Sequence, residues 1–570
     1  MTTTRQYDNL NRLISISSAG TGSGAPQSSF ANAYNGANQR TRVNLADGSF
    51  WAYEYDALGQ VKSGKRYWSD WTPAAGQQFE YAFDDIGNRT STKAGGNSAG
   101  TALRAATYSA NTLNQITQRD VPGAVDIIGA ATATATSVTV NNQPAYRRGE
   151  YYQLALSINN GSTPQWTSVT NLAVQSGTTN TVIGNSFLPQ TAEILSYDAD
   201  GNLTNDGRWM LTWDAENRPT KIESQASGPL ASKRKITLDY DWRGRLIRRT
   251  EYNGASGSYL VTNDVKFLSD GLHCIAELNA TNNALLRSYL SGRDVSGTMT
   301  GAGGVGGLLE INSVSNGVHF CAYDGNGNVT ALVKGTDGTS SANYEFDPFG
   351  QAIRCTGVMA KENPYRSSTK RTDDATDLVH YEFRIYRPAT GRWLSRDPID
   401  ERGGFHLYGF LRNWPTGNPD LLGLTFNWDP PYLYTRTTYI ATPDGGRIYG
   451  QTDWYYFHPQ VKVWGCLEPS GGCCGYKLKV YGSAKVWAWW VFDQDWARVH
   501  EMQHVNWHYF PAYASFKENA EAYEAVCFSR KEKALCIKSV IENQMKDLYM
   551  VQAYTQGSYF DCQTWGEKRP

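Results

Sequence analysis

The residues with the clearest chemical potential lie near the C-terminal end of the chain, in the segment His500-Glu501-Met502-Gln503-His504. Positions i and i+4 share one face of a helix, so His500 and His504 can both present ring nitrogens to one metal ion. Zn²⁺ favours such ligands, and Glu501, next to the first histidine, is placed to act as a general base on water. The spacing therefore predicts a hydrolytic zinc centre, with a pair of solvated surface histidines as the alternative interpretation.

A zinc hydrolase needs a third protein ligand, and a second predicted helix after Pro511 offers three glutamates. Glu518, Glu521 and Glu524 are three residues apart and lie roughly along one side of that helix. Glu524 and Glu521 rank nearly equal as the third ligand, ahead of Glu518, and each could instead be an ordinary solvated carboxylate. This arrangement resembles the gluzincin metallopeptidases, in which a glutamate on a following helix completes the zinc site.

A second candidate site is a pair of carboxylates, Asp397 in an Arg-Asp-Pro sequence and Asp420 in an Asp-Leu-Leu-Gly-Leu sequence. Two aspartates that share one proton can activate water and protonate a leaving amide, as they do in aspartic proteases. Separation in sequence does not show that the two carboxylates meet in space. Structural roles in turns are the alternative interpretation for both.

Most of the chain before these residues consists of short units that begin with an aromatic residue and Asp. The units begin at Tyr7, Tyr55, Phe83, Tyr197, Trp213, Tyr240, Tyr323 and Phe346. The aromatic ring packs on a sheet face, the Asp-x-x-Gly-Asn type of sequence makes a turn, and a β-branched run begins the returning strand. One hairpin alone is marginal, so neighbouring hairpins must form one long sheet, and a twisted sheet of that length has to curl.

Residues 120–192 interrupt the repeats with alternating apolar and polar residues and frequent turns. This pattern predicts a small β-sandwich inserted into the repeat region. A structural role for the insertion is favoured over a carbohydrate-binding one, because no group of reactive residues occurs there.

Further along, several motifs occur in a fixed order: YEFDPFGQ at 344–351, NPYR at 363–366, and YEFRIYRPATGRWLSRDP at 381–398. With the stretch that ends at Leu424, they resemble the core of the Rhs/YD-repeat family. The resemblance is specific over about 80 residues, weaker over residues 1–343, and ends near residue 424. It implies that the sheets spiral into a hollow shell that encloses an unrelated C-terminal toxin domain.

The same resemblance assigns roles to the two aspartates. It implies that Asp397 and Asp420, with Arg396 as a supporting residue, cut the chain just after Leu424. One position departs from the family pattern, because Leu421 stands where the family has proline after the second aspartate.

The chain is therefore predicted to be mainly β, with a C-terminal α+β zincin-like domain. The predicted parts are YD repeats at 1–119, an inserted β-sandwich at 120–192, YD repeats at 193–343, the Rhs-type core with its cleavage site at 344–424, and a metallopeptidase toxin at 425–570.

Composition sets limits on these predictions. The 570 residues carry a formal net charge of −1, which argues against a protein that coats nucleic acid. No secretory signal and no run of 18 apolar residues is present, and the chain opens almost inside a repeat, as a truncated gene product would.

Most of the nine cysteines lie in the tail: Cys466, Cys473, Cys474, Cys527, Cys536 and Cys562. Disulfides formed in an oxidising compartment are favoured there over buried free thiols.

The resemblance and the zinc motif together predict a secreted or delivered effector whose self-cleaved tail hydrolyses peptide bonds. The expected partners are a cognate immunity protein, a secretion or delivery machine and a protein or peptide substrate, with no nucleic acid and no membrane span. Two alternatives remain. The tail is a metal-dependent nuclease, although basic residues do not cluster around its histidines, or the protein is a structural or adhesion shell with an inert tail.

Overall fold

The computed structural model describes residues 1–20, 27–417, 420 and 422–424, together with the backbone of the strands between Tyr432 and Phe528. The chain divides into two compact units, Met1–Asn427 (unit 1) and Trp428–Pro570 (unit 2). Almost all regular structure in the described residues is β-strand. The predicted mainly β class is therefore confirmed.

The first long sheet of unit 1 is an antiparallel meander of eleven strands, in which each strand pairs with the next along the chain until β18 closes the order. Its strands are β1 (Thr2–Tyr7), β2 (Leu13–Ala19), β3 (Ser28–Tyr34), β4 (Arg40–Leu45), β5 (Phe50–Tyr55), β6 (Val61–Tyr67), β7 (Pro73–Phe83), β8 (Arg89–Gly95), β9 (Leu103–Ala110), β10 (Ile116–Arg119) and β18 (Glu193–Ile194).

The second long sheet continues the meander with fourteen strands in sequence order. They are β19 (Ser196–Tyr197), β20 (Leu203–Asn205), β21 (Trp209–Trp213), β22 (Pro219–Ser224), β23 (Arg234–Tyr240), β24 (Leu246–Asn253), β25 (Leu260–Asp270), β26 (His273–Asn279), β27 (Leu285–Ser291), β28 (Leu308–Ser313), β29 (Gly317–Tyr323), β30 (Val329–Lys334), β31 (Ser340–Phe346) and β32 (Ala352–Thr356).

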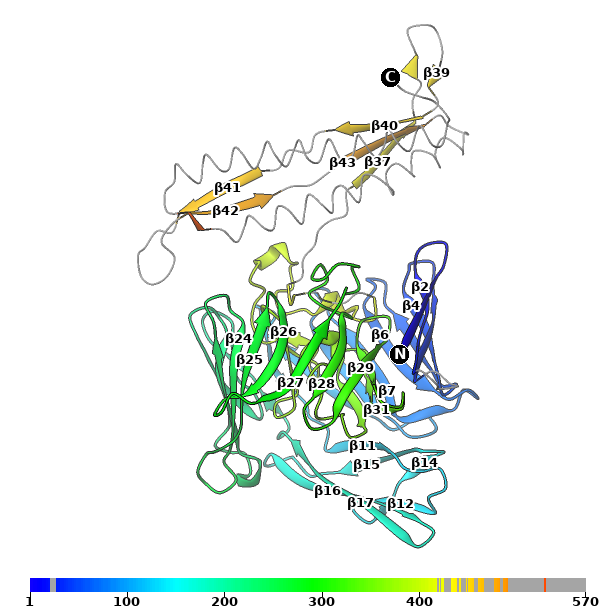
Figure 1. Cartoon of the computed structure of the whole chain (residues 1–570), viewed down its shortest axis with the longest axis vertical. Helices are drawn as coiled ribbons and strands as arrows, with labels where there is room; N and C mark the ends of the chain where they lie inside the picture. Colours follow the sequence, from blue (N-terminus) through cyan, green and yellow to red (C-terminus); the bar gives the residue numbers. More distant parts are fainter. Residues whose placement is uncertain are drawn as a thin grey trace. The chain divides into compact units, whose positions relative to one another are not determined.

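The insertion forms two small sheets that lie as two layers at one end of unit 1 (Figure 1). One layer is β11 (Ala124–Ala130), β15 (Tyr151–Ser157) and β14 (Tyr146–Arg148), and the other is β13 (Gln143–Pro144), β12 (Ser137–Val140), β16 (Gln165–Gln175) and β17 (Thr178–Leu188). Both layers contribute to one apolar cluster, which includes Val140, Leu156 and Val169. The insertion is thus a β-sandwich with its own core.

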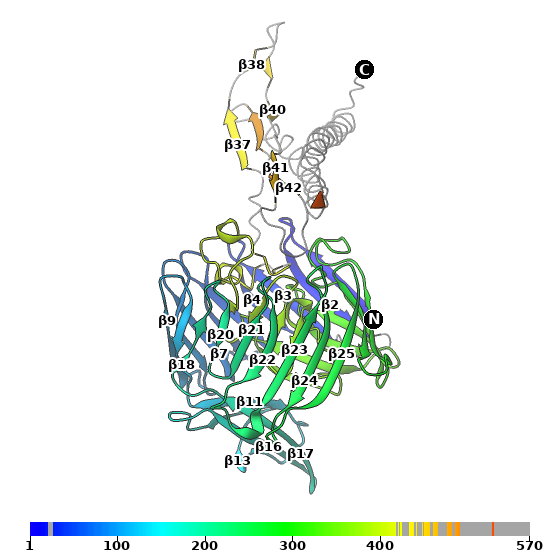
Figure 2. The same cartoon turned by 90° about the vertical axis from the view of Figure 1, so that its left-hand side faces the viewer.

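The segment after β32 lies between the two long sheets, where Figures 1 and 2 show it in yellow-green. It forms a four-stranded sheet of β33 (Arg371–Asp373), β34 (Leu378–His380), β35 (Ile385–Arg387) and β36 (Arg392–Trp393). Short 3-10 helices in unit 1 are η1 (Leu230–Ser232), η2 (Ser367–Thr369), η3 (Asp400–Arg402) and η4 (Leu411–Asn413).

In unit 2 the described strands form three small sheets. The first is β37 (Tyr432–Thr437), β43 (Lys485–Trp490) and β40 (Gly450–Tyr455), with β37 parallel to β43. The second pairs β38 (Ile440–Ala441) with β39 (Arg447–Ile448), and the third is β41 (Gln460–Gly465), β42 (Tyr476–Tyr481) and β44 (Cys527–Phe528).

Each hairpin turn of the repeats is closed by the side chain of its first residue. In the turn between β5 and β6, Oδ1 of Asp56 accepts hydrogen bonds from the backbone N–H groups of Leu58 and Gln60, at 2.9 Å each. Gly59 has a φ of +84°, in the left-handed region that favours glycine. The same pair of bonds recurs in the turns that begin at Asp8, Asn35, Asp84, Asn111, Asp214, Asp241, Asp324 and Asp347.

Neighbouring turns are also joined to one another. The side chain that follows one turn reaches into the next, as Asn88 does when its amide donates to Oδ1 of Asn114 at 2.9 Å. Asn202 donates to Oδ1 of Asn217 in the same way at 2.7 Å. The two contacts join residues that are 26 and 15 positions apart, so the turn residues also help to hold neighbouring hairpins in line.

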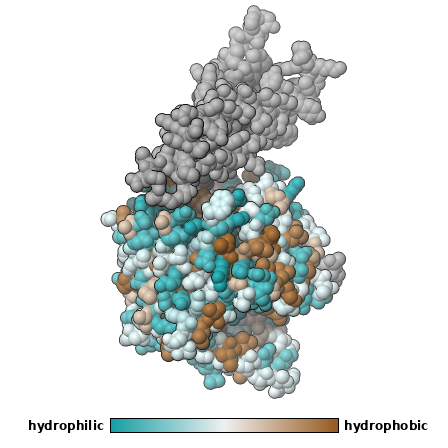
Figure 3. Space-filling view, turned by 60° about the vertical axis from the view of Figure 1, so that its left-hand side comes forward, coloured by the Kyte–Doolittle hydropathy of each residue, from teal (hydrophilic) through white to brown (hydrophobic). Residues whose placement is uncertain are grey.

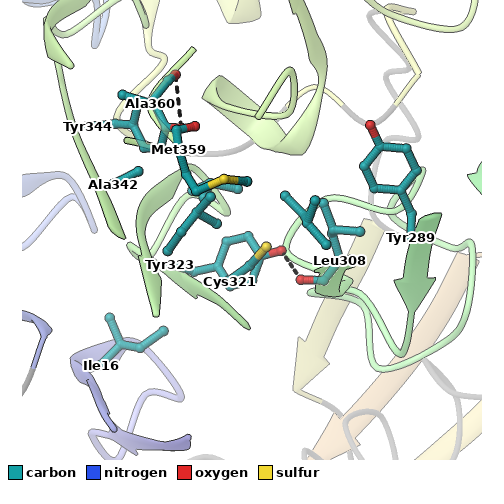
Figure 4. Close-up of a cluster of buried hydrophobic side chains, with 12 residues drawn as sticks. Ile16, Tyr289, Leu308, Cys321, Tyr323, Ala342, Tyr344, Met359 and Ala360 are labelled. Carbon is teal, nitrogen blue, oxygen red and sulfur yellow. Dashed lines mark hydrogen bonds between the residues drawn. The ribbon is translucent and has the colours of Figure 1, made fainter. Parts of the chain in front are cut away.

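The interior of the curled sheets is filled by side chains of both sheets and of the segment that follows β32. Figure 4 shows one such cluster, in which Ile16 from β2 lies with Tyr323, Tyr344 and Met359. In this cluster the hydroxyl groups of Tyr289 and Tyr323 donate to protein oxygens, and that of Tyr344 donates to the backbone oxygens of Met359 and Ala360. Burial of these rings is therefore not opposed by unpaired hydroxyl groups.

The outer surface of unit 1 carries separate apolar patches within a mostly polar surface (Figure 3). This follows from the alternation of side chains along strands that have one buried and one solvated face. Among the described residues, no helix has the length and apolar character needed to span a membrane.

We predict that the turn aspartates stabilise unit 1 through their backbone contacts. Asp84→Ala removes the acceptor of the Asn88 backbone N–H, a bond of 2.7 Å, and of the Asn88 side chain at 2.9 Å. It should lower the free energy of unfolding by about 1–3 kcal/mol, because buried donors lose their partner. The neighbouring exposed Asp85 is the matched control, and Asp85→Ala should change stability by less than about 0.5 kcal/mol. Equal effects of the two variants in thermal unfolding would contradict this role.

Candidate active site

The segment between the sheets is held in place by buried ion pairs. Arg371 of β33 and Arg287 of β27 both contact Glu277 of β26, the second at 3.1 Å. Arg387 of β35 contacts Glu193 of β18 at 2.8 Å. A charge removed from water is tolerated only when it is paired, so these contacts define one position of the segment relative to both sheets. That position sets the geometry of the candidate site.

One of the two predicted carboxylates, Asp397, pairs with the guanidinium group of Arg384, which immediately precedes β35. Nη2 of Arg384 lies 2.9 Å from Oδ2 of Asp397, and both side chains are almost completely buried. The guanidinium also lies over the ring of Trp393, with 4.3 Å between its carbon and the ring centroid. Asp420 is close enough for its charge to act on Arg384 as well. The fold therefore brings residues 384, 397 and 420 together.

Asp420 closes a tight turn just before the predicted cleavage point. Its Oδ1 accepts hydrogen bonds from the backbone N–H groups of Leu422, Gly423 and Leu424, at 3.3, 2.7 and 3.2 Å. Its Oδ2 is buried, and among the described residues it has no hydrogen-bond partner. This oxygen is therefore a place where a proton can reside.

Burial raises the pKa of Asp420 to about 6, although the charge of Arg384 and the backbone N–H of Gly423 oppose the shift. Burial also lowers the pKa of Arg384 to about 10, against the charges of Asp397 and Asp420. Asp420 can thus exchange a proton near neutral pH, while Asp397 is the ion-pair partner of Arg384. Two carboxyl groups in different surroundings meet the requirement for an acid and a base.

The backbone before the predicted cleavage point is tightly held. The carbonyl oxygen of Gly423 accepts a hydrogen bond from Nε of Arg384, and the carbonyl oxygen of Leu422 accepts one from the N–H of Phe383 at 3.2 Å. Gly423 has a φ of +77°, and an added Cβ would lie 2.8 Å from Cβ of Tyr381. Only glycine fits this position.

A cavity of about 210 Å³ opens beside this group of residues. Arg384, Phe383 and Tyr381 line one side, and side chains of β21 to β28 line the other. The lining is more apolar than polar, and neither Asp397 nor Asp420 belongs to it. Arg384 thus lies between this cavity and the buried region that holds the two carboxyl groups and the fixed backbone segment.

Arg396, the residue predicted to support the aspartates, is exposed, and its side chain lies against Gly201. Along this extended segment Ser395 and Asp397 are buried and Arg396 between them points outward. The guanidinium that contacts Asp397 is that of Arg384, which the sequence analysis did not single out. The sequence held a signal for Arg384, because it is a charged residue within the aromatic run YEFRIY. A charge in such a run is expected to be buried and to need a partner of opposite charge.

The predicted zinc site lies outside the described residues. This holds for His500, Glu501, His504, Glu518, Glu521 and Glu524, and the side chains of the tail cysteines lie outside them as well. The described cysteines Cys274, Cys321 and Cys355 are free thiols. Within the part of the chain that the structure describes, no group of three metal-ligating side chains occurs.

No protein-family model matches the chain. Among curated proteins, it is 28% identical over 257 residues to the tRNA nuclease WapA of Bacillus subtilis (strain 168), which covers 43% of this chain and 10% of WapA. It is 26% identical over 314 residues to the double-stranded DNA deaminase toxin A of Burkholderia cenocepacia (strain H111), covering 52% of this chain and 21% of that protein. Over 81 residues it is 36% identical to the toxin subunit YenC2 of Yersinia entomophaga, which covers 14% of this chain and 8% of YenC2.

Among solved structures, the crystal structure of TcdB2-TccC3-Cdc42 aligns with 74% of this chain and 21% of that chain, at 16% identity and a TM-score of 0.35. The chain spans about a tenth of the length of WapA and about a fifth of that of the deaminase toxin. These three curated relatives are thus longer proteins that are named as toxins or nucleases.

We predict that Arg384 is required for the stability of this region in a pH-dependent way. Arg384→Met leaves two buried carboxyl groups without their cation and should cost about 3–5 kcal/mol at pH 8. The cost should be smaller at pH 5, because Asp420, with a pKa of about 6, is then protonated and no longer needs the cation.

Arg384→Lys should give an intermediate loss, because it keeps the charge but loses the fork of hydrogen bonds to Gly423 and Leu407. The exposed Arg396 supplies the control, since Arg396→Met should change the unfolding temperature little at either pH. A pH-independent loss in Arg384→Met would show that the carboxyl groups do not depend on this cation.

Proposed function

We propose that the chain is a toxin carrier that cleaves itself after Leu424 and so frees its C-terminal unit as a toxic enzyme. The observation that supports the cleavage step most directly is the shared contact of Arg384 with Asp397 and with the carbonyl oxygen of Gly423. The toxin role is supported by the similarity to longer proteins that are named as toxins.

In the proposed reaction, water attacks the carbonyl carbon of Leu424. Asp397, as the carboxylate, takes a proton from that water, and protonated Asp420 gives a proton to the amide nitrogen of Thr425 as the bond breaks. The products are a carboxyl group on Leu424 and an amino group on Thr425, so one water molecule is consumed. Arg384 is a positioning residue, because it orients Asp397 and holds the chain at Gly423.

We further propose that the freed tail is a zinc-dependent peptidase. The donor set of His500, His504 and either Glu524 or Glu521 suits Zn²⁺, which prefers nitrogen and oxygen ligands in tetrahedral sites. When bound, Zn²⁺ supplies Lewis acidity that makes water a stronger acid and polarises a peptide carbonyl. Glu501 accepts the proton of the attacking water and passes it to the leaving amine.

A nuclease tail is the second candidate. It is favoured by the names of the curated relatives, which include tRNA nucleases and a DNA deaminase toxin. Against it stands the sequence around the histidines of the tail, where basic residues do not form the cluster that phosphate binding favours. We therefore propose that the tail does not act on nucleic acid, and assays with tRNA and plasmid DNA test this.

A toxic tail also requires partners. We propose a cognate immunity protein that protects the producing cell and a delivery machine that carries the chain to its target. Disulfides among the tail cysteines would form if the tail acts in an oxidising compartment. The two fragments are proposed to remain associated after cleavage.

Purified protein should appear as two fragments, cut after Leu424, that co-elute under native conditions. Asp397→Asn and Asp420→Asn should each slow cleavage about 100-fold or more, because a general acid or base contributes that much. The exposed Asp400 in the same loop is the control, and Asp400→Asn should cleave normally. In Asp397→Asn, which retains Asp420, the residual rate should fall as pH rises through about 6, where Asp420 loses its proton. An intact wild-type chain would refute the proposal.

The tail chemistry is tested on the full chain with zinc, casein and tRNA or plasmid DNA. Glu501→Gln should retain zinc and abolish casein hydrolysis, because the ligands remain and the base is lost. His504→Ala should lose zinc and activity together, and only one of Glu524→Ala and Glu521→Ala should release zinc. Glu532→Gln is the matched control and should retain both. Unchanged activity of Glu501→Gln excludes the peptidase, and degradation of nucleic acid instead of casein supports the nuclease.

A further inference from the structure

Strand β17 is a long and unprotected sheet edge at the outer side of the insertion. It is the last strand in the order β13-β12-β16-β17, and all eleven of its residues pair with β16 without a register shift. Its sequence, TTNTVIGNSFL, holds no charged residue and no proline. Residues 178–185 are exposed, and the side chains of Val182 and Ile183 are 62% and 69% exposed.

The other sheet edges in the described part of unit 1 are protected against pairing with another chain. They are short, or they carry a charge or a proline, which are the usual means of blocking edge-to-edge contact. The charges are Arg5 in β1, Asp126 in β11, Arg148 in β14, Glu193 in β18, Arg354 in β32, Asp373 in β33 and Arg392 in β36, while β13 holds Pro144 and β19 has two residues. Strand β17 is the exception, and it is also one of the longest strands.

The hydrogen-bond pattern shows which backbone groups of β17 face outward. Thr170 of β16 points its backbone toward β12, because its C=O accepts from the N–H of Asn141 and its N–H donates to the side chain of Asn141. Thr170 is paired with Ile183. Because the backbone groups of Thr170 face β12, the two residues exchange no backbone hydrogen bonds. The N–H and C=O of Ile183 therefore point away from β16, to the free edge. By alternation, the odd-numbered residues of β17 offer an unpaired row of donors and acceptors.

We propose that β17 pairs antiparallel with β17 of a second copy of this chain, with Ile183 on the two-fold axis. Ile183 is the middle residue of Thr178–Leu188 and faces the edge, so this register overlaps the two strands along their full length. It places Thr181 opposite Asn185 of the partner subunit and Val182 opposite Gly184 of the partner subunit. The pairing joins two four-stranded layers into one continuous sheet.

A second copy suits this edge better than a charged peptide does. The strand has no charge that could select such a partner, and self-pairing opposes no like charges. A two-fold contact uses the same patch on both subunits, which requires a self-complementary surface. The antiparallel register meets this need, because outward-facing odd residues oppose odd residues, and the exposed Ile183 side chains of the two subunits lie side by side at the centre of the contact.

The full chain should therefore form a dimer whose population rises with concentration in sedimentation velocity. Ile183→Lys sets two cations against each other on the axis and should weaken the dimer about tenfold or more. Val261, an exposed valine of β25, is the matched control, and Val261→Lys should leave the dimer unchanged. A wild-type chain that is monomeric at about 100 μM, or a dimer that survives Ile183→Lys, would overturn the proposal.

Cross-linking tests the register itself. In a hydrogen-bonded antiparallel pair the facing Cα atoms are about 5.5 Å apart, within the range that a disulfide spans. Under mild oxidation Ile183→Cys should give a covalent dimer whose mapped peptide joins position 183 to itself, and Val261→Cys should not. Thr181→Cys should not link to itself but should link in a mixture with Asn185→Cys. Cross-links at other positions of β17, or binding of a different protein at this edge, would contradict the pairing proposed.

Discussion

Many hairpins of the two long sheets are closed by one side-chain oxygen, which accepts two backbone N–H groups of its own turn. Asp56 and Asp241 show the arrangement, with bonds to the residues two and four positions further on. Because strands in a meander pair only with their neighbours, each such turn helps to set the register of the two strands that it joins. A slip of one residue would exchange the buried and exposed faces of a strand, so the interior depends on the turns.

A curled sheet has a concave face that must be filled, and here much of the filling is charged. Arg371 and Arg387 of the inner segment are paired with Glu277 and Glu193 of the sheets. Such pairs add little net stability relative to apolar packing, but a charge that has lost its partner is costly. These ion pairs therefore determine where the inner segment lies relative to the sheets, because only one placement of the segment pairs all these charges at once.

The candidate site lies where one buried cation, Arg384, is near two buried carboxyl groups. Arg384 serves Asp397, Asp420 and the Gly423 carbonyl together, and Oδ2 of Asp420 is left buried. A buried carboxyl group with a raised pKa costs stability, and such costs are concentrated at sites that move protons. The chemistry proposed for unit 2 is separate, because it depends on the tail's own histidines and glutamates and not on the shell. Function in this chain thus resides in sites that the β framework carries.

The sequence by itself determined the features that depend on near neighbours. The aromatic-Asp units predicted the hairpins and the mainly β class, because the bonds of each turn join residues two and four apart. The motif resemblance also named Asp397 and Asp420, and the spacing of His500 and His504 predicted the zinc site, which is still a prediction from sequence. Tertiary structure decided that Arg384 and not Arg396 contacts Asp397, and that β17 is an open edge. Both depend on burial and on strands that meet only after the chain has curled, and sequence spacing does not encode such distances.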